Sequence, residues 1–152
     1  MSLIKHGKRL LALSSVWLLG FGGIDNAVVR TIAEAVPLGP EWTVFPLAPP
    51  LEVQRVGQKI RIKLPGVNDW AKPEGLMLQD GSSIVINVEL LDQSGQRFTL
   101  IPTSIGPFTG FTLDDPEEGA GFLKNRRFTE LRIRSNKPIL AKAIDWYCWT
   151  GK

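Results

Sequence analysis

Histidine, cysteine and tyrosine each occur only once in this chain of 152 residues. A single cysteine, Cys148, cannot form an intrachain disulfide or a cysteine-rich zinc site. The single histidine, His6, lies in a basic N-terminal segment. The rest of the chain therefore lacks the residues for a Ser-His-Asp triad, a Cys-His pair or a histidine-based metal site, which excludes these classes of enzyme.

A strong charge excess is also missing, since the formal net charge is only +3. Most of this surplus belongs to the first 35 residues, which contain the following charged side chains: Lys5, Lys8, Arg9 and Arg30 against Asp25 and Glu34. The remainder of the chain is nearly neutral. This balance argues against a body that binds nucleic acid.

A hydrophobic run follows the basic N-terminal segment. Residues 10–29, between Arg9 and Arg30, are long enough for a helix that crosses a membrane. The preceding basic residues predict that the N-terminus stays inside and that the C-terminal domain is periplasmic or extracytoplasmic. Two alternatives remain open: a secretory signal cleaved after Ala35, which would yield a secreted protein, and an ordinary buried helix.

Small residues in this run predict close packing against another helix of a membrane complex. Trp17 lies away from the interfacial ends of the run, so we expect it to pack on a partner or a cofactor. The helix-packing residues are Ser14, Trp17, Gly20, Gly22 and Gly23.

Residues 24–36 carry apolar side chains at helical spacing, which predicts a helix that Pro37 ends. Residues 37–50 contain five prolines and predict an extended linker, or a strap over the domain. We therefore expect a basic tail with a signal-anchor helix over 1–36, a proline-rich linker over 37–50 and a β-domain over 51–152.

After residue 51 the sequence indicates strands. The segment "KIRIKL" alternates, with Ile60, Ile62 and Leu64 predicted to point inward. Further strands are expected over residues 83–92, 97–102, 108–113, 128–135 and 139–149, the last two joined by the turn "SNKP". The fold class is mainly β: an antiparallel β-sandwich, jelly-roll-like or Ig-like, preceded by one hydrophobic helix, with a small β-barrel as the alternative.

The last strand carries the candidate binding site. Alternation predicts Ile144, Trp146 and Cys148 in the core and the other side chains displayed on the opposite face. If the preceding strand is its neighbour, two arginines lie beside them. The candidate binding residues are Asp145, Tyr147, Trp149, Arg132 and Arg134. An aromatic face with charged groups suits a carbohydrate or a protein partner; alternatively it packs under the proline-rich segment.

Two charged segments are further candidate sites. Lys59, Arg61 and Lys63, alone or together with Arg132 and Arg134, form a basic strip that suits anionic lipids or an acidic partner, or that is simply a solvated face. The acidic loop 114–118 has oxygen ligands but no calcium-binding spacing, and its adjacent acids fit a solvated turn better than a hydrolase site. We expect no metal and no cofactor.

These observations favour a non-enzymatic function. The chain is interpreted as an extracytoplasmic β-sandwich, anchored by residues 10–29, that acts as an accessory or interaction subunit of a larger membrane-associated complex. The alternative is a secreted or anchored carbohydrate-binding module that uses exposed aromatic residues of the last strand.

Overall fold

Strands make up the regular structure of the chain wherever it is described. The computed structural model describes residues 17–19, 27–52, 58–72, 75–78, 80–105, 108–112 and 126–149. All strand pairs in these ranges are antiparallel. Over the same residues no helix has the length and apolar character needed to span a membrane. The predicted mainly β, antiparallel class is therefore confirmed.

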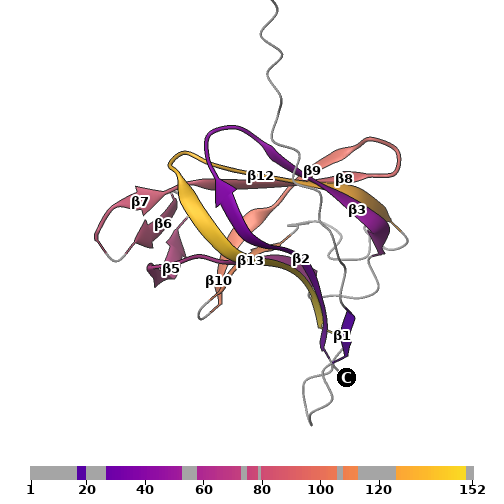
Figure 1. Ribbon diagram of the computed structural model, residues 1–152, viewed down its shortest axis with the longest axis horizontal. Helices are drawn as coiled ribbons and strands as arrows, with labels where there is room; N and C mark the ends of the chain where they lie inside the picture. The colour runs from indigo at the N-terminus through magenta and orange to yellow at the C-terminus, as the bar shows by residue number, and fades with distance from the viewer. Residues whose placement is uncertain are drawn as a thin grey trace, which may run out of the picture.

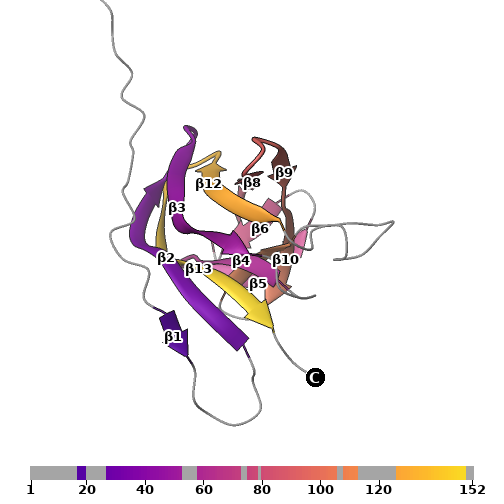
Figure 2. The same cartoon turned by 90° about the vertical axis from the view of Figure 1, so that its right-hand side faces the viewer.

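The largest sheet has six strands. In spatial order they are β1 (Trp17–Leu19), β2 (Ala27–Leu38), β13 (Ile139–Trp149), β4 (Gln58–Lys63), β11 (Phe108–Thr112) and β10 (Ile101–Ile105). Figure 2 shows β1 beside β2 at one edge of this sheet.

Two smaller sheets complete the described structure. The four-stranded sheet contains, in spatial order, β3 (Thr43–Glu52), β12 (Arg127–Ser135), β8 (Ile86–Asp92) and β9 (Arg97–Thr99). The three-stranded sheet contains β5 (Val67–Lys72), β6 (Gly75–Leu78) and β7 (Ser83–Ile84). In Figure 1 the four-stranded sheet lies above the six-stranded one, and the small sheet closes the left end.

Strand pairing in the two large sheets is nested. The outermost strands β2 and β13 pair with each other, then β3 with β12, then β4 with β11, and innermost β8 with β9. A second set of pairings, β13 with β4 and β12 with β8, joins these strand pairs into the two sheets. Of the nested strands, the first and the last, β2 and β13, therefore lie side by side in the same sheet.

The core lies between the two large sheets. Along β4 and β8 every second side chain points inward, as the alternating pattern predicted. The predicted inward residues Ile60, Ile62 and Leu64 are all buried. The largest fully buried side chains come from both sheets and include Phe45, Phe111, Phe128, Leu90, Leu131 and Ile144.

The helix expected over residues 24–36 is wrong where the structure describes the chain, because residues 27–38 form strand β2. Its β-branched side chains favour an extended backbone, and pairing with β13 along almost its whole length outweighs the helical spacing. Within the helix expected over 10–29, Trp17–Leu19 and residues 27–29 are likewise strands. The other residues of that prediction lie outside the described ranges.

The β-region begins earlier than residue 51. Strand β2 belongs to the six-stranded sheet and β3 to the four-stranded sheet. Strand β3 contains three of the prolines of residues 37–50. This proline-rich strand lies at the edge of its sheet, paired only with β12. An edge position tolerates proline because the missing N–H would otherwise face away from the neighbouring strand. Residues 43–50 of this segment are thus part of a strand of the four-stranded sheet.

The turn between β12 and β13 does not make a hairpin. The two strands lie in different sheets, so residues 136–138 cross from one layer to the other. Two hydrogen bonds join Asn136 at this corner to Val85. The Oδ1 of Asn136 accepts a hydrogen bond from Val85 N at 2.9 Å, and the backbone N of Asn136 donates one to Val85 O at 3.0 Å. The predicted pairing of residues 128–135 with 139–149 is therefore wrong.

A buried carboxylate organises the turn between β8 and β9. Asp92 Oδ1 accepts hydrogen bonds from the N and Oγ of Ser94 and from Gln96 N, at 2.7–2.9 Å. Arg126 Nη1 donates to Asp92 Oδ2 at 2.8 Å. The hydrogen bond from the Ser94 side chain, together with the backbone and Arg126 hydrogen bonds, holds the pKa of Asp92 below its usual value. Burial acts in the opposite direction and raises this pKa.

Acid is therefore expected to weaken the fold through Asp92. Because its pKa is lowered in the folded state, the stabilisation is complete above the usual carboxyl pKa of about 3.9 and is lost as the pH falls through the folded value. Asp92→Asn should lower the unfolding free energy near neutral pH, and its difference from the wild type should shrink on acidification. Urea unfolding at several pH values measures this difference, and a constant gap would contradict the assignment.

Candidate binding face

A row of cations lies on the outside of the six-stranded sheet along β4. This strand is central, paired on one side with β13 and on the other with β11. Ile60 and Ile62 are fully buried, so the alternate residues Lys59, Arg61 and Lys63 point away from the core. The predicted basic strip is thus a real feature of the folded chain.

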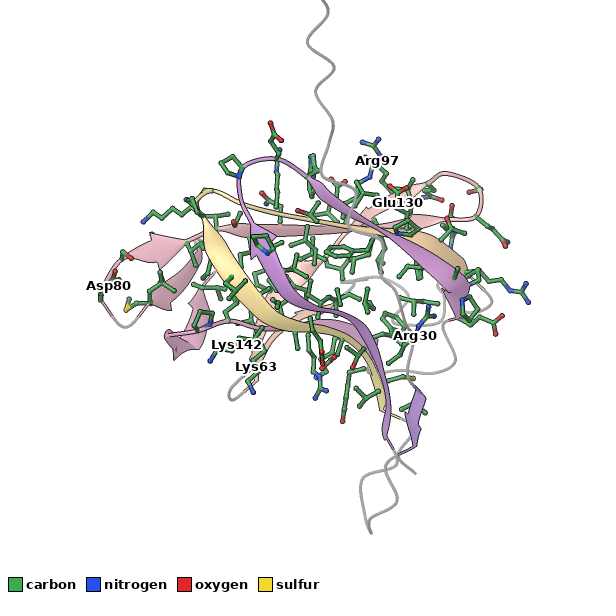
Figure 3. The ribbon with its side chains drawn as sticks, in the orientation of Figure 1. Arg30, Lys63, Asp80, Arg97, Glu130 and Lys142 are labelled. Atoms are coloured by element: carbon green, nitrogen blue, oxygen red, sulfur yellow. The ribbon has the colours of Figure 1, made fainter. Side chains whose placement is uncertain are left out.

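Strand β13 brings its outward residues beside this row. Asp145 is in register with Arg61, and Tyr147 with Lys59. In Figure 3 Lys142 lies close to Lys63 below the sheet, in agreement with the pairing of Ala143 with Lys63. We call this set the basic face; it consists of Lys59, Arg61, Lys63, Lys142, Asp145 and Tyr147.

Arg61 is the centre of the basic face. Its Nη2 lies 3.5 Å from Asp145 Oδ2, and the side chains of the pair are 18% and 10% exposed. Its guanidinium carbon lies 4.5 Å from the centroid of the Tyr147 ring. The Nζ atom of Lys59 lies 5.3 Å from the same centroid. Both distances allow a cation–π interaction, so the tyrosine ring and the carboxylate together position two cations.

Two cations placed over the same tyrosine ring repel each other. Burial, and to a lesser extent the charge of Arg61, lowers the pKa of Lys59 below its usual value. An anion that approached both groups would relieve this repulsion and replace part of the lost hydration. The basic face is therefore arranged to accept negative charge.

Asp145 is less accessible than the sequence predicted. It points outward as expected, but it is only 7% exposed because it pairs with Arg61. Tyr147 is half-buried, with cations over its ring. The prediction of an open aromatic platform is therefore corrected: the ring supports cations instead of offering a bare surface.

Arg132 and Arg134 do not join Asp145 and Tyr147. They lie on β12 in the four-stranded sheet, where Arg132 Nε bonds Glu130 Oε1 at 2.5 Å. Arg134 Nε donates to Asn87 Oδ1 at 3.2 Å, and its guanidinium lies 4.4 Å from the Trp42 ring centroid. The predicted juxtaposition failed because the chain changes sheets between β12 and β13. The residues that take their place, Lys59 and Arg61, come from β4, far away in sequence.

Several other predicted residues remain without a structural test. Trp149 pairs through its backbone with Ala27, but its side chain lies outside what is described. Trp17 is in β1, again with its side chain outside the description. The acidic loop 114–118 lies outside the described ranges. So do the other predicted helix-packing residues, which are Ser14, Gly20, Gly22 and Gly23.

Cys148 is buried, as predicted from its place in the core alternation with Ile144 and Trp146. Burial in apolar surroundings makes a thiol unreactive. Among the described residues, no group of three or more histidine, cysteine, aspartate or glutamate side chains is placed to hold a metal ion.

Comparisons of the chain with protein-family models, with curated proteins and with solved structures give no significant match.

Proposed function

We propose that the chain is a non-enzymatic binding subunit that works outside the cytoplasm in a larger membrane-associated assembly, and that the basic face contacts its partner. The observation that carries the proposal is the contact of Arg61 with both Asp145 and Tyr147. Arginine and tyrosine are enriched among the residues that dominate binding energies at interfaces. A guanidinium that is already held in place loses less conformational freedom when a partner binds.

The finer fold that we infer is a jelly-roll sandwich. Its support is the nested pairing of eight strands, in which β2, β13, β4 and β11 are neighbours in one sheet and β3, β12, β8 and β9 in the other. Double-sheet jelly rolls with eight strands occur in lectin and capsid domains. The architecture alone does not define a function, but it is compatible with a binding role.

The extracytoplasmic location is proposed from the basic residues and apolar run at the N-terminus. Cleavage after Ala35 would remove most of β2, including buried Arg30 and Ile32, and would leave β13 paired over residues 143–148 with β4 alone. The folded sheet therefore favours retention of residues 27–35. A membrane-spanning helix over residues 10–29 would also require Trp17–Leu19 to leave strand β1.

A second candidate function is carbohydrate binding. It is favoured by the combination of Tyr147 with hydrogen-bonding charged groups on an outer sheet face. Because cations lie over the Tyr147 ring, this ring is less suited to stacking on a neutral sugar. Binding would therefore depend on charged or hydroxyl groups of the ligand.

Charge reversal on the basic face tests the proposed function. Tagged full-length chain is extracted from native membranes with mild detergent, and the co-purifying proteins and glycans are identified by mass spectrometry. Lys59→Glu/Lys63→Glu should lose the partner, because it replaces two attractive charges with repulsive ones. The matched control is Arg97→Glu/Lys137→Glu, which changes the net charge equally at exposed positions away from the basic face; Figure 3 shows Arg97 on the opposite side of the molecule from Lys63.

The control variant should keep the partner, and both variants should melt like the wild type. Retention of the same partners by both variants would show that the basic face is not the contact surface.

A further inference from the structure

We propose that the ligand of the basic face is an acidic polysaccharide, a linear chain of sugars bearing carboxylate or sulfate groups, which lies along β4. This inference rests on the proposed binding role of the face and gives the second candidate function a defined ligand chemistry.

The cations occupy alternate positions of one strand. Side chains at alternate positions of a strand are about 6.6 Å apart, so Lys59, Arg61 and Lys63 extend over roughly 13 Å. The neighbours Gly110 of β11 and Ala143 of β13, in register with Arg61 and Lys63, are small, whereas Asp145 and Tyr147 of β13 flank Arg61 and Lys59. A linear polymer with repeating negative charges matches such a row better than a compact single anion.

The charge balance of the face is positive. Its four cations are Lys59, Arg61, Lys63 and Lys142, and its one carboxylate is Asp145. Glu34 of β2 is a second, exposed acidic residue in register with Ala143 at the margin. With both carboxylates included, the cations are still in excess. Since Lys59 and Arg61 share one ring, a ligand carboxylate placed between them is attracted by both.

The central position of β4 argues against an acidic peptide bound as an added strand. That mode of recognition uses the free backbone groups at the edge of a sheet. The backbone of β4 is already paired with β13 and β11. A ligand can therefore reach this strand only through its side chains.

The composition of the face argues against a membrane surface. Proteins that lie on a membrane insert apolar side chains into the headgroup region in addition to their basic residues. Among the described residues, the large apolar side chains that are exposed are Met77, Val85, Ile101 and Leu140. Ile101, in register with Thr112 and through it with Lys59, and Leu140, two residues before Lys142, flank the basic face as separate side chains, and none of the six residues of the face itself is an exposed apolar residue. The hydroxyl of Tyr147 and the charged groups around it instead suit the hydroxyl and carboxylate groups of a sugar acid.

Binding of full-length chain to immobilised polygalacturonate and alginate tests the proposal, with neutral dextran as the reference. We expect binding to the two acidic polymers and none to dextran. Lys59→Glu/Lys63→Glu should weaken it about tenfold or more, a change of about 1.4 kcal/mol, while Arg97→Glu/Lys137→Glu should stay within about twofold. Ionic strength near 1 M, where the screening length is about 3 Å, should abolish it.

Three further outcomes would overturn the inference. Equal weakening by the two variants would indicate attraction by net charge alone. Preference for vesicles of phosphatidylglycerol and phosphatidylcholine, or for polyglutamate, over the acidic polysaccharides would point to a membrane or a protein. Failure to bind either polysaccharide, while Lys59→Glu/Lys63→Glu still loses its co-purifying partner, would reject this ligand and leave the proposed function standing.

Discussion

Replacing Ile62 by aspartate is expected to unfold the domain. Ile62 is fully buried on β4, in register with buried Ile144 on one side and buried Thr109 on the other. A carboxylate there has no cation in register to pair with, so it must either stay charged in an apolar interior or bind a proton. The cost is several kcal/mol, against a total stability of about 5–15 kcal/mol for a typical domain. Circular dichroism and thermal melts of the full-length chain measure the result.

The control for this substitution is the next residue, Lys63. It is exposed on the opposite side of the strand, and Lys63→Ala should change the unfolding free energy by no more than about 0.5 kcal/mol. The full chain is needed because a fragment beginning near residue 38 would lack β2, which pairs with β13. Equal tolerance of the two substitutions would mean that the inward and outward sides of β4 are assigned the wrong way round.

Alternation within single strands is the part of the fold that the sequence predicts well. Ile60 and Ile62 are buried, and Ile144, Trp146 and Cys148 face the core as expected. This succeeds because each strand has one face against the core and one toward solvent, so local pattern and burial agree.

Which strands become neighbours could not be predicted in the same way. The turn after β12 looks like a hairpin, yet the pairing partners of β13 are β2 and β4. Such pairings depend on the packing of both layers and leave no local signal. Arg30 illustrates the same limit. It belongs by sequence to the basic N-terminal part, but it is 3% exposed, and its Nη1 donates to Pro49 O at 2.6 Å. Burial lowers its pKa.

The candidate site was therefore found in part. Composition and alternation identified Asp145 and Tyr147 on one strand and the basic strip on another. What they could not supply was that Lys59 and Arg61 lie in register with Tyr147 and Asp145. A carboxylate on one strand and alternating cations on another would favour the pairing of β13 with β4. Arg132 and Arg134 on β12 meet the same condition, so this signal does not identify the neighbour.

Replacing Trp146 by alanine is expected to cost about 3–5 kcal/mol of stability, as large-to-small changes in a core do. Trp146 is 5% exposed and belongs to the same buried cluster as Leu131 and Ile133 of the opposite sheet. It also lies in register with Ile60 and with Arg30, so the cavity would border a buried guanidinium. Urea unfolding monitored by circular dichroism gives the free energy of unfolding directly.

The adjacent residue provides the matched test of register. Tyr147 is half-buried beside the cations of the basic face, so Tyr147→Ala should lower stability less than Trp146→Ala. Tyr147→Phe keeps the ring that holds Lys59 and Arg61 and should be nearly neutral for folding. Since successive side chains of a strand point to opposite faces, the two alanine variants must separate if β13 is in the register found here. If Tyr147→Ala were the more damaging, Tyr147 would be the core residue, and the binding surface would move to the opposite face of the strand.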